Sequence, residues 1–150
     1  MKDSHTILIV EDNPTDVMLI RRAFARSNIG NPIQVASDGD RAVSYLSGRD
    51  GYHDRAQYPL PALVLLDLKL PRRSGLEVLE WLRGQDALRR LPVVMLTSSR
   101  QSQDVNRAYD LGANSYLVKP VEFEDLQEML GTINTYWITY NEKPNIAPIG

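Results

Sequence analysis

Hydrophobic residues gather in five short runs along the chain, each of a length that suits one β-strand. None of the runs alternates cleanly between apolar and polar residues, which is typical of parallel strands covered by helices on both faces. The predicted strands are ILIV at 7–10, IQVA at 33–36, LVLLDL at 63–68, VVML at 93–96 and SYLV at 115–118.

Stretches with the apolar spacing of an amphipathic helix lie between and after these runs. Capping residues mark some of their starts, because Asn and Asp accept hydrogen bonds from free N–H groups and proline fits the first helical position. The predicted helices begin at Asn13-Pro14, begin at Asp38 or Asp40, cover 74–83, cover 99–111 and begin at Glu122. Alternating strands and helices predict an α/β fold, a doubly wound five-stranded parallel sheet flanked by five helices.

Two segments are longer than a compact α/β fold requires. Residues 47–61 form a polar connection with Gly, Pro and Tyr, and residues 136–150 form a tail rich in aromatic residues and prolines. Long connections in compact domains are often functional or mobile. The chain of 150 residues suits one domain, which we expect over 1–140, with a tail at 141–150.

Composition and charge exclude several classes of protein. The net charge of -2 and the lack of a basic stretch give no reason to expect nucleic acid or a membrane surface as a partner. The chain has no cysteine, which excludes disulfides and thiolate chemistry. The first apolar run is too short for a signal peptide or a membrane span, so we expect a cytoplasmic protein.

Polar residues follow or end four of the five predicted strands. Glu11 and Asp12 follow the first, Asp67 lies at the end of the third, Thr97 follows the fourth and Lys119 the fifth. Ligands of open parallel sheets bind outside the carboxyl ends of the strands. If these four strands are neighbours, their terminal side chains meet in one crevice.

Such a crevice is chemically suited to phosphoryl transfer. Three carboxylates repel one another unless a cation compensates, and oxygen ligands suit Mg²⁺. Mg²⁺ together with Lys119 would bring the crevice close to neutrality, so that it accepts an anionic phosphoryl group. The Asp67 carboxylate can then act as a nucleophile, and the Thr97 hydroxyl would donate to a phosphoryl oxygen.

Each of these residues also has an ordinary interpretation. A single acid at a strand end is usually solvated or caps a helix, and Glu11 and Asp12 alone would favour the dipole of the next helix. His5 and His53 are expected to be ordinary exposed residues. The hypothesis of a site therefore rests on the convergence of several residues.

Four motifs resemble the receiver domains of bacterial two-component response regulators: ILIVEDN, LLDLKLPRRSG, LTSS and YLVKP. The resemblance covers about residues 5–135. It implies a flavodoxin-like fold with strand order 2-1-3-4-5. It also implies a phosphoacceptor signalling protein that is not an enzyme beyond self-phosphorylation from a phosphodonor and autodephosphorylation.

The resemblance assigns Asp67 as the residue that a sensor histidine kinase phosphorylates. It implies that Glu11, Asp12, Asp67 and the main-chain carbonyl of Lys69 hold Mg²⁺. Lys69 lies two residues after Asp67, and Ser99 lies two after Thr97. We expect Lys69 and Ser99 to flank the path of the hydrolytic water and to tune the lifetime of the phosphorylated state.

The same resemblance implies a conformational switch. Thr97 is the switch hydroxyl, Tyr116 is the switch aromatic residue and Lys119 contacts the phosphoryl group. The Lys119–Pro120 peptide bond is expected to be cis.

A narrower resemblance is to the single-domain regulators paired with phytochrome histidine kinases. It rests on the long connection at 47–61, on LLDLKLPRRSGLEVL and on the tail TINTYWITYNEKP, and it implies a bacteriophytochrome as phosphodonor. We expect a homodimer through the fourth helix, fifth strand, fifth helix and C-terminal aromatic segment, because exposed aromatic residues favour interfaces. The alternative is that the aromatic residues fold back over the edge of the domain's own sheet.

Three other functions remain open from the residues. A receiver-like adaptor would act by protein binding without phosphorylation, with all the same residues present. A haloacid-dehalogenase-type phosphatase is disfavoured because Lys69 stands where that family has a second aspartate. A flavin-binding module is disfavoured because Glu11 and Asp12 would repel a phosphate after the first strand.

Overall fold

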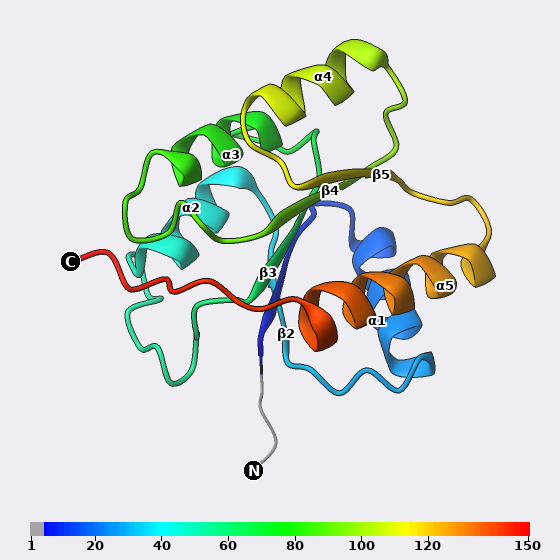
Figure 1. Ribbon diagram of the computed structural model, residues 1–150, viewed down its shortest axis with the longest axis horizontal. Helices are drawn as coiled ribbons and strands as arrows, with labels where there is room; N and C mark the ends of the chain where they lie inside the picture. Colours follow the sequence, from blue (N-terminus) through cyan, green and yellow to red (C-terminus); the bar gives the residue numbers. More distant parts are fainter. Residues whose placement is uncertain (1–4) are drawn as a thin grey trace.

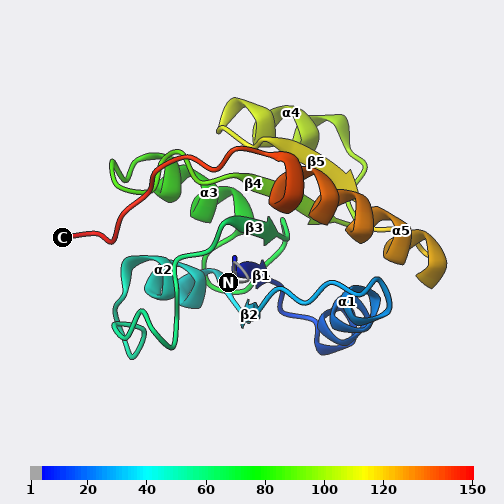
Figure 2. The same cartoon turned by 60° about the horizontal axis from the view of Figure 1, so that its bottom comes forward.

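The computed structural model describes residues 5–150 as helices packed on both faces of one parallel sheet (Figures 1 and 2). The strand order is β2-β1-β3-β4-β5, which confirms the predicted fold class and topology. The strands are β1 Ile7–Val10, β2 Ile33–Ala36, β3 Leu63–Leu66, β4 Val93–Thr97 and β5 Ser115–Val118.

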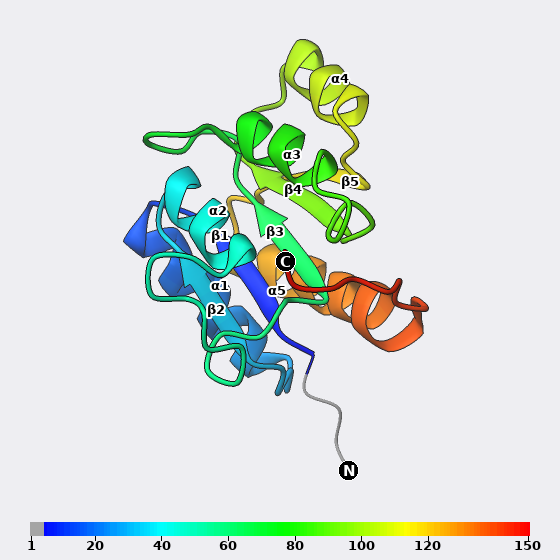
Figure 3. The same ribbon diagram turned by 90° about the vertical axis from the view of Figure 1, so that its left-hand side faces the viewer.

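The helices lie in two layers. α1 packs against α5 on one face, while α2, α3 and α4 follow one another on the other face (Figures 2 and 3). α5 continues without a break into the π-helical segment η1. Their bounds are α1 Pro14–Arg26, α2 Gly39–Ser47, α3 Gly75–Arg83, α4 Ser102–Asp110, α5 Phe123–Ile133 and η1 Asn134–Tyr140.

The central strands are apolar throughout because both of their faces are buried. Successive strand residues point to opposite faces, so Leu8 and Val10 join the core under α2 and α3, while Ile7 and Ile9 join the core under α1 and α5. Because neither face of these strands meets solvent, apolar and polar residues do not alternate along them in the sequence.

Local hydrogen bonds explain where the helices begin. Asn13 caps α1 by accepting from the N–H groups of Thr15 and Asp16. Asp38, not Asp40, caps α2 by accepting from the Arg41 N–H at 2.7 Å. Both α1 and α2 therefore begin at positions that the sequence had marked.

The fourth helix is shorter than the predicted range of 99–111. It begins at Ser102 because Ser99 is held in the preceding loop. The Ser99 hydroxyl donates to Asp104 Oδ2 at 2.5 Å, and its carbonyl accepts from the Tyr116 hydroxyl at 3.0 Å. Both bonds fix an irregular connection between β4 and α4.

The connection between α2 and β3 is irregular in backbone but firmly attached. The Arg55 guanidinium donates to the carbonyls of Tyr45, Leu46 and Tyr58 at 2.8–3.0 Å. The Tyr45 hydroxyl donates to Pro59 O at 2.7 Å. This segment is therefore a structured extension of α2.

The tail after η1 folds back onto its own domain and reaches the loop between α3 and β4 (Figure 1). The Ala147 N–H donates to Ala87 O at 3.0 Å, and Ile146 and Ile149 pack against the core under α2 and α3. Tyr136 and Tyr140 of η1 stay 56% and 73% exposed. The segment that folds back is thus 141–150, which has no aromatic residue, while η1 presents two tyrosines to solvent.

Within residues 5–150, no helix has the length and the apolar composition that crossing a membrane requires.

Candidate functional site

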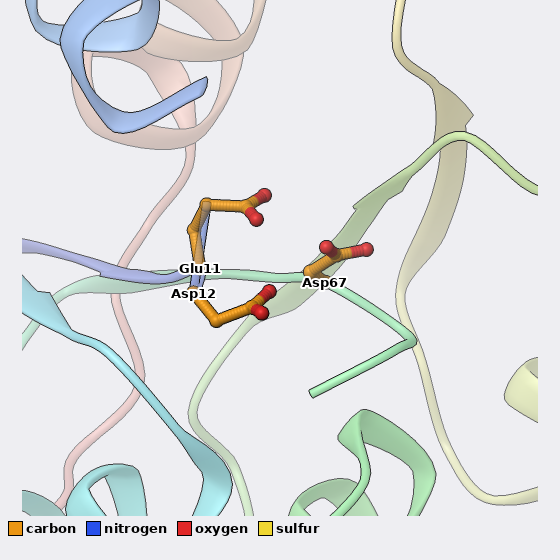
Figure 4. A group of neighbouring side chains, drawn as sticks. All are labelled: Glu11, Asp12 and Asp67. Carbon is orange, nitrogen blue, oxygen red and sulfur yellow. The ribbon is translucent and has the colours of Figure 1, made fainter. Parts of the chain in front are cut away.

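Three carboxylates meet at the carboxyl edge of the sheet (Figure 4). Glu11 and Asp12 follow β1, and Asp67 follows β3, whose last residue Leu66 pairs with Val10. One oxygen from each carboxylate lies within 4.8 Å of the others. Glu11 is 3% exposed and Asp67 is 8% exposed, whereas Asp12 faces solvent. The pairing of β1 with β3 brings together acids that are far apart in sequence.

Close backbone packing holds Asp67 in place. Its N–H donates to Val10 O at 3.0 Å, and its Oδ1 accepts from the Leu68 N–H at 2.7 Å. The start of α3 presses on the same peptide, since a Cβ on Gly75 would lie 2.0 Å from the Asp67 carbonyl oxygen. Gly75 is not among the positive-φ residues. Lack of space, and not the unusual φ expected of glycine in a turn, requires glycine there.

Lys119 extends from the end of β5 into the acidic cluster. Its Nζ donates to Glu11 Oε1 at 2.5 Å, to Asp16 Oδ2 at 3.0 Å and to Asp67 Oδ2 at 3.4 Å. Together with the neighbouring Asp12, the site holds four carboxylates and one ammonium group, which leaves a surplus of three negative charges. The lysine alone does not neutralise the cluster.

Burial and ion pairing shift the pKa values of this cluster. Burial raises the pKa of Glu11 to about 6, although the hydrogen bonds from Lys119 and from the Asn13 N–H act against it. Burial by itself would lower the pKa of Lys119. The hydrogen bonds to Glu11 and Asp16 and the charge of Asp67 outweigh it and hold that pKa above its usual value. Lys119 therefore stays charged.

The donor set fits a divalent cation of the magnesium type. Mg²⁺ prefers carboxylate and carbonyl oxygens and keeps several waters, and the cluster offers three carboxylates with a surplus of negative charge. Asp12 and Lys69 line one open hollow of about 520 Å³ beside the cluster, so the predicted metal-binding residues lie next to solvent that can complete the coordination.

Thr97 and Tyr116 occupy the neighbouring strands. Thr97 is the buried last residue of β4, and its carbonyl accepts from the Lys119 N–H at 2.8 Å. Tyr116 is half-buried against the core under α2 and α3, with its hydroxyl bonded to Ser99 O. Burial raises the pKa of Tyr116. The predicted switch residues thus lie on either side of the β4–α4 connection.

Asp16 is the residue at this site that the sequence analysis missed. It lies in the first turn of α1, where an acid is explained by the helix dipole alone. Its position in the first turn of a helix that begins directly after the acidic pair was the available signal that it lies near the same edge.

The expectation of a cis Lys119–Pro120 bond is wrong. Residues 5–150 contain no cis peptide bond. Even before proline the trans form is the more stable isomer, because the cis form brings the flanking Cα atoms closer together.

The two histidines differ in their exposure to solvent. His53 is exposed, as expected, in the connection between α2 and β3. His5 is half-buried instead of exposed, because it lies two residues before β1, where its carbonyl accepts from Asn31 Nδ2 at 3.0 Å.

The chain is similar in sequence to known response regulators. The model of the response regulator receiver domain matches residues 7–131. The chain is 42% identical over 146 residues to the probable methanogenesis regulatory protein FilR2 of Methanothrix harundinacea, covering 97% of this chain and 92% of that protein. It is 36% identical over 132 residues to the response regulator Rcp1 of Synechocystis, covering 88% of each.

Two solved structures are similar over nearly the whole chain. The phosphorylated cyanobacterial phytochrome response regulator RcpA aligns with a TM-score of 0.88 at 33% identity, covering 95% of this chain and 100% of that one. The Mn²⁺-bound form of Rcp1 aligns with a TM-score of 0.84 at 35% identity, covering 93% and 99%. These similarities confirm the resemblance that the sequence motifs indicated.

Proposed function

This chain belongs to the response regulator receiver family, and from that premise we propose that it accepts a phosphoryl group on Asp67 from a sensor histidine kinase. Receiver domains are phosphoacceptor signalling proteins and not classical enzymes. The observation that carries the proposal is the environment of Asp67, a nearly buried carboxylate beside two others and 3.4 Å from Lys119 Nζ.

The two oxygens of Asp67 have different surroundings. Oδ1 is held by the Leu68 N–H, whereas Oδ2 faces Lys119. We therefore assign Oδ2 as the nucleophile. Its new bond to phosphorus forms as the phosphorus–nitrogen bond of the kinase phosphohistidine breaks, and the released imidazole nitrogen keeps the bonding electron pair. Lys119 and the Thr97 hydroxyl donate to the phosphoryl oxygens.

Glu11, Asp12, Asp67 and the main-chain carbonyl of Lys69 would hold Mg²⁺. The bound ion supplies positive charge that offsets both the acids and the incoming phosphoryl oxygens. The surplus of negative charge around Lys119 explains why the chain's own residues do not suffice for this.

The switch is proposed to run from Thr97 to Tyr116 through the β4–α4 connection. A phosphoryl group on Asp67 draws the Thr97 hydroxyl toward it and moves the loop that holds Ser99. The Tyr116 hydroxyl is bonded to that loop, so the surface formed by α4, β5 and α5 changes with it.

The partners are proposed on the same basis. Rcp1 and RcpA are similar over most of this chain, and RcpA is a phytochrome response regulator. We propose a phytochrome-type histidine kinase as the phosphodonor. We also propose a homodimer through α4, β5, α5 and η1, which is supported by the exposed side chains of Tyr109, Tyr136 and Tyr140.

The proposal is tested by intact mass after incubation with acetyl phosphate and Mg²⁺. We expect the mass to rise by one phosphoryl group in the wild type, and neither in Asp67→Asn nor in the presence of EDTA. A purified phytochrome kinase as donor then tests the narrower proposal. No gain in mass with any donor would favour an adaptor that acts by protein binding alone.

The same assay measures the lifetime of the phosphorylated form. Lys69 is exposed beside Asp12, and we expect Lys69→Ala to alter the rate of autodephosphorylation. An unchanged decay rate would remove Lys69 from the proposed path of the hydrolytic water.

A further inference from the structure

Lys119 lies among three carboxylates, and one of them, Asp16, has no role in the function proposed above. An ammonium group has three N–H donors. The contacts of Lys119 Nζ to Glu11, Asp16 and Asp67, at 2.5, 3.0 and 3.4 Å, engage all of them. A phosphoryl oxygen that binds Lys119 must therefore compete with contacts that already exist.

Asp16 is held in a fixed position for this contact. The Asp16 N–H donates to the capping Asn13 side chain at 3.2 Å, which sets the first turn of α1. Asp16 and Lys119 also border a small cavity of about 40 Å³ between α1 and α5. The other residues around this cavity are Leu19, Ile20, Pro120 and Leu126. Apolar groups thus shield one side of the ion pair from water.

The distances from Lys119 Nζ show which carboxylates hold the ammonium group most closely. Nζ lies closer to Asp16 Oδ2 than to Asp67 Oδ2. Asp16 is 34% exposed at its side chain, whereas Glu11 is 3% exposed. Water can solvate Asp16 when the lysine leaves, but it cannot readily replace the lysine at the buried Glu11. Of the contacts to Glu11 and Asp16, which both remain carboxylates when Asp67 is phosphorylated, the Asp16 contact is therefore displaced at the lower cost.

We propose that Asp16 is a positioning residue, which draws the Lys119 ammonium toward α1 and competes for it with the phosphoryl group on Asp67. The inference rests on the function proposed above. In the unphosphorylated protein Asp16 shares the lysine with Glu11. In the phosphorylated protein the lysine–phosphoryl contact forms at the expense of the Asp16 contact. Loss of the Asp16 charge therefore favours the phosphorylated state.

The test compares the wild type with Asp16→Asn in the presence of Mg²⁺. Calorimetric titration measures the affinity for beryllium fluoride, an unreactive analogue of the phosphoryl group, and intact mass follows the rate of phosphorylation by acetyl phosphate. We expect the affinity and the phosphorylation rate of Asp16→Asn each to be about two- to five-fold higher than in the wild type. The effect is small because a partly exposed ion pair contributes little free energy. Asp16→Ser serves as a second variant if Asp16→Asn does not fold.

Three controls separate positioning from a general effect of charge or stability. Glu122→Gln removes an acid from an exposed position three residues beyond Lys119, and Asp16→Glu keeps the carboxylate. Both are expected to behave like the wild type. In a Lys119→Met background, Asp16→Asn is expected to have no effect on beryllium fluoride affinity, since its action passes through the lysine.

The outcomes distinguish the inference from the proposed function. If the wild type binds beryllium fluoride and Asp16→Asn binds it equally or more weakly, competition by Asp16 is overturned and the proposed function stands. An equal rise in Glu122→Gln also overturns it, since the effect is then one of charge alone. If the wild type neither binds the analogue nor gains a phosphoryl group, both proposals fail.

Discussion

At the scale of single residues, the placement of Asp67 depends on the absence of a side chain at Gly75. The first residue of α3 lies against the peptide of the acceptor, and its N–H donates to Leu68 O at 2.9 Å. Gly39 makes a similar approach at the start of α2, where a Cβ would lie 1.8 Å from Arg73 O. Two helix starts therefore pack directly on the loop that follows β3.

Gly75→Ala is expected to destabilise the protein by about 1–3 kcal/mol, because an added methyl group forces the backbone apart. It is also expected to slow phosphorylation, since the displaced peptide is that of Asp67. Urea denaturation measures the first effect, and intact mass after incubation with acetyl phosphate measures the second.

Gly84→Ala is the matched control for Gly75→Ala. Gly84 has φ -84°, and the nearest atom to an added Cβ is Trp81 O at 3.4 Å, an ordinary contact. Equal urea midpoints for the two variants would show that Gly75 has more room than its geometry indicates.

At the scale of elements, α2 and the segment that follows it are held together by a guanidinium group bonded to carbonyls and by packed tyrosine rings. The Arg55 guanidinium binds carbonyls at the C-terminal end of α2, where the helix dipole favours a positive charge. The rings of Tyr45, Tyr52 and Tyr58 pack on one another with centroids 4.9–5.9 Å apart. The connection at 47–61, whose length suggested a functional or mobile segment, is firmly packed.

This packing predicts a specific sensitivity to alkaline pH. Burial raises the pKa of Tyr45 from 10.0 to about 12. Below pH 10 the phenol is protonated in both the folded and the unfolded chain, so its contribution is fully present. As the pH rises from 10 toward 12 the unfolded chain loses this proton first, and the stability falls.

The free energy of unfolding in urea, measured from pH 8 to pH 11.5, checks this. We expect Tyr45→Phe to lose less stability over the range than the wild type, although its stability at pH 8 is lower because the bond to Pro59 is absent. Tyr140→Phe, at an exposed position, should keep the wild-type slope. Equal slopes for Tyr45→Phe and the wild type would contradict the effect.

At the scale of the whole molecule, the C-terminal residues divide into two parts. The tail at 141–150 packs against its own domain through Ile146, Ile149 and the Ala147 N–H. η1 instead leaves Tyr136 and Tyr140 in solvent. Residues 141–150 therefore stabilise the fold, whereas the exposed tyrosines of η1 can take part in the proposed dimer.

A shortened chain and a double variant test these two roles separately. A chain that ends at Asn141 is expected to lose about 1–3 kcal/mol of stability, because two half-buried isoleucines lose their packing, but to keep its self-association. The double variant Tyr136→Ser, Tyr140→Ser is expected to keep the stability of the wild type but to lose its self-association. Urea denaturation and light scattering after size-exclusion chromatography measure the two properties. A shortened chain that is monomeric and fully stable would contradict both assignments.

The class of fold and the positions of the acidic residues could be predicted from the order of residues along the chain. Continuous apolar runs required strands buried on both faces, and residues such as Glu11, Asp12 and Asp67 follow those runs directly. The starts of α1 and α2 were also predicted, at Asn13 and at Asp38 or Asp40, because a cap acts on N–H groups only two or three residues away. Local periodicity and capping are properties of neighbours in the chain.

Contacts between groups that are distant in the chain could be identified only in the folded structure. Asp16 and Lys119 are 103 residues apart and meet only because α1 and the end of β5 border the same edge of the sheet. Gly75 needs its missing side chain because of the Asp67 carbonyl, and not because of its own φ. The position of the tail also depends on packing against the folded domain. Contacts of this kind arise from the close approach of elements in space, and no local pattern in the chain encodes them.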